Sequence, residues 1–224
     1  MLIEVLAQSR FVQKVAGLVG LTGTQLGSLR VSQIEADGDE MTRAGLRYHM
    51  SACGATGIAP VQAIPSTAAQ WMIYNPLSNP VTAFLDRIGM VELSGTIGVT
   101  GNAMWAAIVP PKYLPSTIPT QSAANVVIQN ANAVSAKASS LIVVSGQTLQ
   151  NIAAGNWFPL ARELSAATTA FLAGTQQIDT GWDVRGKFAI PPGCGLALGT
   201  ISAAGTSPVY APFGSWREYT SDVE

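Results

Sequence analysis

The run Gln70-Trp71-Met72-Ile73-Tyr74 gives the clearest indication of the fold. Successive side chains of a β-strand point to opposite faces of the sheet, so a strand with one wet face alternates apolar and polar residues. After Gln70 both alternating sets are apolar, which is typical of a strand buried on both sides. The stretch 184–188, Val-Arg-Gly-Lys-Phe, alternates instead and favours a strand with one face toward solvent.

Short apolar runs of this kind recur along the chain from residue 46, separated by clusters of Gly, Pro, Asn and Ser. The runs that predict strands are 46–52, 69–75, 82–93, 101–109, 125–129, 140–144, 186–190 and 195–201. Since no long helical pattern lies between them, they favour an antiparallel β-sandwich, an all-β fold, over βαβ units. The segment from Pro110 to Pro119 is expected to be an irregular loop, because each Pro removes a backbone donor.

The first 45 residues have a different pattern. Apolar residues at roughly helical spacing include Leu2, Leu6, Val12, Val15 and Val19. That pattern ends in a glycine-rich stretch, and the densest charge cluster of the chain follows at residues 35–40. We therefore predict an extended or partly helical N-terminal arm over residues 1–45 and a β-sandwich domain over 46–224.

The composition excludes several classes of protein. The 224 residues are 48% hydrophobic and 11% charged, with a formal net charge of −1, whereas soluble domains average about 25% charged residues. A net charge near zero argues against a basic nucleic-acid binder, and high hydrophobicity argues against disorder. We expect no nucleic acid among its partners.

A membrane or secretion role is not expected either. The uncharged run 50–85 contains Pro60, Pro65, Pro76 and Pro80, which are incompatible with a spanning helix. At the N-terminus, Glu4 stands where a secretion signal needs positive charge.

The motifs that suggest catalysis or metal binding are all weak. Asp179-Thr180-Gly181 resembles half of an aspartic-protease site, but a turn between strands is favoured. His49, the single histidine, is expected to be structural or on the surface, and Asp37-Gly38-Asp39-Glu40 lacks the ligand spacing of a calcium loop. We predict no catalytic residue, metal or cofactor. Cys53 and Cys194 are expected to be small core thiols, with a disulfide as the alternative.

The tryptophans fall into two groups. Trp71 and Trp105 lie in apolar runs and are expected in the core. Trp157 and Trp182 have more polar neighbours, so they are candidates for surface stacking on a glycan or on a neighbouring subunit, with a core or interface position favoured over a glycan site.

Several longer phrases carry a family resemblance, and they lie between residues 35 and 219. They are Ala-Asp-Gly-Asp-Glu-Met-Thr-Arg-Ala-Gly (36–45), Thr-Gly-Ile-Ala-Pro-Val-Gln-Ala-Ile-Pro (56–65), Ala-Ala-Gln-Trp-Met-Ile-Tyr-Asn (68–75), Ile-Gly-Met-Val-Glu-Leu-Ser-Gly-Thr (88–96), Pro-Pro-Gly-Cys-Gly-Leu-Ala-Leu (191–198) and Gly-Thr-Ser-Pro-Val-Tyr-Ala-Pro (205–212). In these phrases the chain resembles small virion structural proteins of tailed bacteriophages. The resemblance implies a jelly-roll-like subunit that multimerises, often as a trimer, on or in a phage particle.

These observations together favour a non-enzymatic virion protein, first of all a capsid decoration or cement protein made in the host bacterial cytoplasm. Its expected partners are copies of itself and the phage capsid protein, with Leu2, Leu6, Phe11 and Val15 of the arm as candidate docking residues. A low charge fits this role, because interface cores are depleted in charged residues. The alternatives are a major capsid or tail and baseplate subunit and, from another class, a carbohydrate- or receptor-binding module.

Overall fold

The computed structural model describes residues 41–51, 57–94, 102–163, 182–202 and 209–220. Clustering of backbone contacts divides the chain into two units, Met1–Asp37 and Gly38–Glu224. All the residues described here belong to the second unit. The predicted arm lies almost entirely outside them and stays a prediction.

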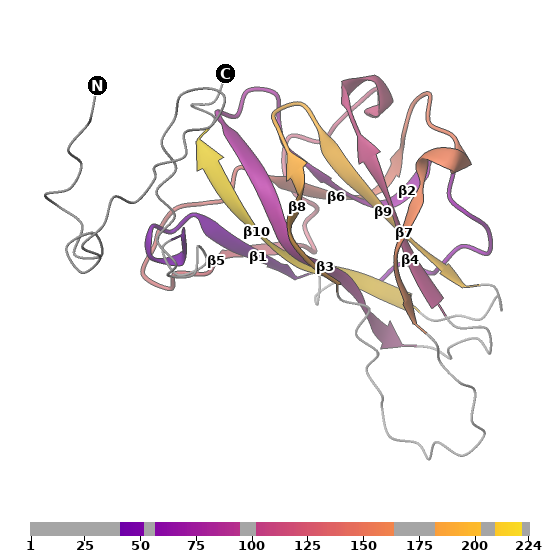
Figure 1. Cartoon of the computed structure of the whole chain (residues 1–224), viewed down its shortest axis with the longest axis horizontal. Helices are drawn as coiled ribbons and strands as arrows, with labels where there is room; N and C mark the ends of the chain where they lie inside the picture. Colours follow the sequence, from indigo (N-terminus) through magenta and orange to yellow (C-terminus); the bar gives the residue numbers. More distant parts are fainter. Residues whose placement is uncertain (1–40, 52–56, 95–101, 164–181, 203–208, 221–224) are drawn as a thin grey trace, which may run out of the picture. The chain divides into compact units, whose positions relative to one another are not determined.

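The second unit is an antiparallel β-sandwich of two five-stranded sheets (Figure 1). The first sheet contains, in spatial order, β5 (Val127–Asn130), β1 (Arg47–Ser51), β10 (Val209–Thr220), β3 (Val81–Ser94) and β8 (Trp182–Ile190). The second contains β6 (Ile142–Thr148), β2 (Ala68–Tyr74), β9 (Gly195–Ser202), β4 (Asn102–Val109) and β7 (Phe158–Glu163). The predicted all-β sandwich is confirmed.

The strand pairing is that of a jelly roll. β1 pairs with β10, β2 with β9, β3 with β8 and β4 with β7, all antiparallel. The chain is thus folded like a long hairpin whose first strand meets its last, and the hairpin is wrapped so that its strands divide between two sheets. The remaining strands, β5 and β6, lie between β4 and β7 in sequence and add one edge strand to each sheet.

The core between the sheets is built from inward-facing side chains of both. Its largest members include Trp71 of β2, Trp216 of β10 and Leu85 of β3, each almost fully buried. Alternate residues of the second sheet, among them Met72 and Ala107, form a separate buried cluster on its other face. The run 70–74 is therefore buried on both sides, as its sequence predicts.

Irregular segments cover that other face of the second sheet. Leu149, Ile152 and Trp157, from the connection between β6 and β7, are buried in the second cluster, and Tyr113 and Leu114 pack against it from the connection after β4. Two short 3₁₀ helices lie in these connections, η2 (Pro111–Tyr113) and η3 (Ala154–Asn156). The Gln150 amide donates to the Tyr113 carbonyl, which ties the two connections together.

The strands β7 and β10 were not predicted, because each contains a proline and proline disfavours a strand. Pro159 lies in β7, an edge strand, where a missing donor is tolerated. β10 contains Pro212 and Gly214 yet is a central strand, with β1 and β3 as its neighbours. A Cβ on Gly214 would lie 2.9 Å from the Arg87 carbonyl oxygen. The glycine thus accommodates a close approach between strands, although in the sequence it reads as a turn.

Residues 41–45 pack against the sandwich, although the sequence places them in the arm. Met41 is buried, and the Gly45 carbonyl accepts hydrogen bonds from Tyr48 Oη and Asn130 Nδ2. Lys137 Nζ donates to the Ala44 carbonyl at 2.9 Å. These contacts fix the point at which the chain enters the domain.

Candidate functional site

The outer face of the first sheet carries a charge cluster centred on Asp86. The pairing of β3 with β10 shifts register here: Ser215 faces Arg87 and Trp216 faces Leu85, so Asp86 is the extra residue of a β-bulge. The bulge lets Leu85 and Ile88 both point into the core while Asp86 points outward.

Two arginines of neighbouring strands share the Asp86 carboxylate. Arg217 Nε of β10 donates to Asp86 Oδ1 at 2.9 Å, and Arg47 Nε of β1 lies 3.4 Å from Oδ2. The Asp86 and Arg217 side chains are each 14% exposed. One carboxylate facing two guanidinium groups leaves an excess of positive charge at this point.

More cations extend this surface across β3 and β8. Arg87 lies 3.8 Å from Asp183 and 5.2 Å from the centre of the Phe213 ring. Arg185 and Lys187 are exposed on β8, and Gly186 between them lies against the Arg217 guanidinium. We call the surface formed by Arg47, Arg87, Arg185, Lys187 and Arg217 the basic face.

His49 lies on the same sheet, exposed on β1. Partial burial of its ring and the nearby Arg47 charge lower the pKa of His49, while Asp86 opposes this effect. The expected surface position of this histidine is confirmed. Among the described residues, no three His, Cys, Asp or Glu side chains gather as metal ligands.

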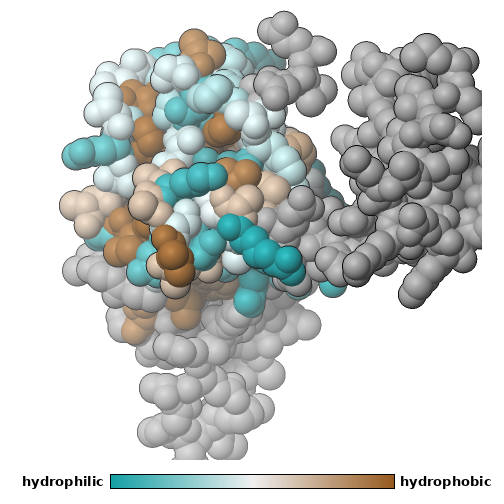
Figure 2. Space-filling view, turned by 90° about the vertical axis from the view of Figure 1, so that its left-hand side faces the viewer, coloured by the Kyte–Doolittle hydropathy of each residue, from teal (hydrophilic) through white to brown (hydrophobic). Residues whose placement is uncertain are grey.

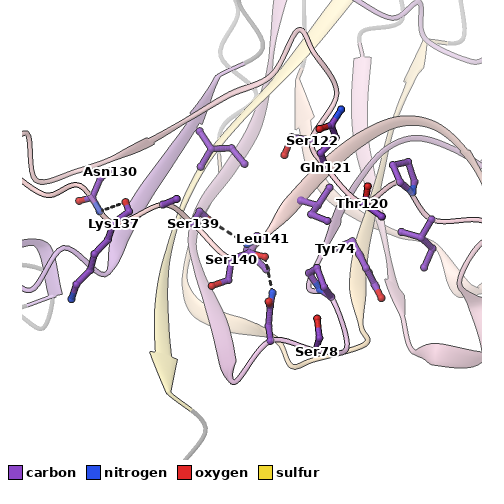
Figure 3. A pocket seen from close by; sticks show the side chains of 17 residues that line it. Tyr74, Ser78, Thr120, Gln121, Ser122, Asn130, Lys137, Ser139, Ser140 and Leu141 are labelled. Atoms are coloured by element: carbon purple, nitrogen blue, oxygen red, sulfur yellow. Dashed lines mark hydrogen bonds between the residues drawn. The ribbon is translucent and has the colours of Figure 1, made fainter.

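A groove of about 710 Å³ lies beside the β5–β6 connection (Figure 3). Its lining mixes hydroxyl and amide side chains with apolar ones, and includes Ser78, Gln121, Asn130, Ile118 and Ile128. Lys137 is the one charged side chain among the lining residues. On one wall, Asn79 Nδ2 bridges the carbonyl of Ser140 at 2.7 Å and Oδ1 of the buried Asn75 at 2.9 Å.

Behind this wall lies a buried carboxylate. Glu218 of β10, 2% exposed, accepts hydrogen bonds from Ser139 Oγ, the Ser140 amide and Trp216 Nε1. Burial, together with the Glu218 charge, raises the pKa of the adjacent Tyr48 phenol to about 12. The network anchors the groove wall to the last strand of the sandwich.

Both predicted stacking residues, Trp157 and Trp182, are described, and they differ in burial. Trp157 is 4% exposed, and its Nε1 donates to the Ser66 carbonyl at 2.8 Å. The prediction of a stacking surface at Trp157 is wrong, because the polar neighbours that suggested it belong to the covering connection. Trp182 is half-buried and packs edge-on against Phe188 at 6.3 Å, with Phe158 stacked beyond at 5.8 Å.

The other tryptophans and the cysteines follow the prediction in part. Trp71 is fully buried, whereas Trp105 is half-buried against the second cluster. Cys194 is a half-buried free thiol, and burial raises its pKa. Cys53 lies outside the described residues.

The remaining candidates also lie outside the described residues. They are the arm residues Leu2, Leu6, Phe11 and Val15, the acidic stretch Asp37 to Glu40, and Asp179.

The basic face and the Glu218 network were not predicted from the sequence. Because side chains alternate along β8, Lys187 points away from the side that Phe188 faces, so the sequence could predict one cation of the face as exposed. The bulge that turns Asp86 outward and the distant pairing of Arg47 with Arg217 have no local sequence signal.

The exposed apolar residues are spread over the described part of the chain. The large ones are Ile64, Leu77, Leu93, Ile108, Val127 and Val134, from six different segments. Figure 2 shows one side of the molecule with its hydrophobic residues in separate patches between hydrophilic ones. Within the described residues, no helix has the length and apolarity to span a bilayer.

Comparisons with family models, with curated proteins and with solved structures each find no match to this chain.

Proposed function

We propose that this chain is a non-enzymatic structural protein of a virus particle, which acts by associating with copies of itself and with neighbouring virion subunits. The observation that carries the proposal is the pairing of first strand with last through all four strand pairs. This jelly-roll order is used by viral capsid domains, by lectin domains and by cupins. The resemblance to small phage virion proteins favours the first of these.

Decoration of a bacteriophage capsid, as a trimer, is the leading role. The 11% charge of the chain supports extensive contact with partners, since surface covered by another subunit does not need solvating charges. The groove, with its mixed polar and apolar lining, and exposed apolar neighbours such as Leu77 are surfaces that a partner can cover.

A shell-forming subunit is the second candidate, and one observation favours it. All four strand pairs of the jelly roll are formed, and β5 and β6 each add an edge strand to one sheet. A complete roll of this size is itself a unit that can tile a closed shell by repeated contacts between copies.

The mass of the purified full-length protein in solution, measured by sedimentation over a range of concentrations, tests the proposal. A stable trimer supports the decoration role, and assembly into large closed particles supports the shell role. A chain that stays monomeric at every concentration, alone and with capsid protein, would contradict both.

A carbohydrate-binding role is the rival from another class, and the burial of Trp157 weakens it. Its remaining aromatic candidate is Trp182, whose ring already contacts Phe188. Binding to a glycan array that disappears in Trp182→Ala and persists in Trp105→Ala would support the rival. We expect neither variant to change glycan binding, because we expect none in the parent.

A further inference from the structure

Cations outnumber anions among the side chains that the structure describes. The side chains that the structure describes include eight cations, Arg43, Arg47, Arg87, Lys112, Lys137, Arg185, Lys187 and Arg217, and three anions, Asp86, Asp183 and Glu218. The excess is local, because residues 38–224 together contain nine Lys and Arg and ten Asp and Glu.

Five of the eight cations form the basic face on four adjacent strands. The order β1-β10-β3-β8 places Arg47, Arg217, Arg87 and the β8 pair in successive rows. Asp86 and Asp183 neutralise part of this charge. Arg185 and Lys187 are exposed and are not paired with either carboxylate in the structure, so they are the cations best placed to meet an outside anion.

The densest negative charge of the chain is the acidic segment, residues 35–40, with Glu35, Asp37, Asp39 and Glu40. Six extended residues span up to about 20 Å, and the four strands of the basic face are about 14 Å across at the usual strand spacing. The segment is therefore long enough to cross the face, and its four carboxylates complement the face in sign.

We infer that the basic face binds the acidic segment of a second copy of this chain. The inference rests on the proposed self-association and specifies one contact of it. Electrostatic complementarity of this kind sets the orientation of partners and the rate of encounter.

Single-stranded nucleic acid is the other polyanion that such a face could bind, and the aromatic residues argue against it. Binding of single strands uses free ring faces on which bases stack. Here Arg87 covers the Phe213 ring at 5.2 Å, and Phe84 and Tyr219 pack edge-on against each other at 5.4 Å. The face offers charge without an open stacking platform.

A charge-reversal experiment on the full-length chain tests the inference. The double variant Arg185→Glu, Lys187→Glu should associate about tenfold more weakly than the parent at about 0.05 M NaCl, since each exposed ion pair contributes about 0.2–1 kcal/mol. The difference should shrink to less than about twofold at about 0.5 M NaCl, where exposed charges are screened. Sedimentation equilibrium measures both values.

Two matched variants make the result specific. Adding Asp37→Lys and Asp39→Lys to the same chain should restore association, because the two surfaces then again have opposite signs. The variant Lys112→Glu changes the net charge as much as Lys187→Glu does but lies off both the basic face and the groove, and it should associate like the parent.

The outcomes separate this inference from the proposed function. If the parent self-associates and the reversal at Arg185 and Lys187 changes nothing, or changes only the stability of the monomer, the inference is overturned and the proposed function stands. Retention of a single-stranded oligonucleotide that the reversal abolishes, with association unaffected, would assign the face to nucleic acid and also overturn it. A parent that never associates contradicts the proposed function itself.

Discussion

Tyr48 and Glu218 show how one buried pair joins three distant segments. Tyr48 Oη lies 3.2 Å from both the Gly45 and the Ala138 carbonyls, and Glu218 holds Ser139 and Ser140. The entry of the chain, the groove wall and the last strand thus meet at two side chains. The apolar pattern of β1 placed Tyr48 in a strand, but Ala138 lies 90 residues away, and that contact could not be read from the sequence.

This arrangement predicts a pH dependence of stability. The folded-state pKa of Tyr48, about 12, is above the ordinary value of 10.0, because burial and the Glu218 charge disfavour the phenolate. A raised pKa contributes stability that is complete below the unfolded pKa and is lost as the pH rises through the folded pKa. Between pH 10 and 12 the wild-type protein should lose up to about 1.4 kcal/mol per pH unit through this group.

The variant Tyr48→Phe isolates the effect, since all other titrations are shared. Near neutral pH it should be less stable than wild type by about 0.5–1.5 kcal/mol, for the lost hydrogen bonding. The difference should fall and then reverse as the pH approaches 12. Urea unfolding at a series of pH values measures this, and a difference that stays constant from pH 8 to 12 would contradict it.

Among the elements of this protein, a connection between strands contributes buried side chains as well as linking the strands. The strands β1 to β6, β8 and β9 overlap the apolar runs that predict them, because burial on a pleated sheet favours such runs. The connection 149–157 also covers the second sheet and hides Leu149 and Trp157 from solvent. The covering role of this connection was not predicted, because its polar residues are typical of a loop. The apolar outer face of β2 indicates that another segment covers it, but the sequence does not identify that segment.

The covering connection should therefore contribute to stability as a core segment does. Leu149→Ala removes a side chain that is 2% exposed and should cost about 2–5 kcal/mol of unfolding free energy. The matched control is Val134→Ala in another connection, which is 94% exposed and should change stability by less than about 0.5 kcal/mol. Chemical denaturation compares the two, and equal small losses would mean that the connection is not part of the core.

For the whole molecule, the net charge of the sequence does not reveal how charge is distributed over the folded surface. The sequence alone gives the fraction of charged residues, 11%, and the net charge of −1, which exclude a uniformly basic protein. The local excess of cations on the basic face, beside only Asp86 and Asp183, appears only when the fold brings distant strands together. A sum over the sequence cannot reveal this, because opposite charges cancel in it wherever they lie in space.

The predicted arm allows a test at the same scale. Deleting residues 1–30 should abolish incorporation into particles, because the candidate docking residues Leu2, Leu6, Phe11 and Val15 are lost. The stability of the domain should change little, since the deleted residues belong to the first unit, Met1–Asp37, and not to the second. Particle occupancy by gel and unfolding by calorimetry measure the two effects, and normal occupancy of the truncated chain would refute the docking role.

The pairing of first strand with last also determines how the domain responds to mechanical force. Arg47 at the start of β1 lies opposite Arg217 near the end of β10 in an antiparallel ladder. A pull that separates the two ends of the chain therefore loads this ladder from one end, and its hydrogen bonds break one after another, as in a zipper. Tension between two tethered ends should peel β1 away at low force, whereas compression by neighbouring subunits loads the whole sandwich at once.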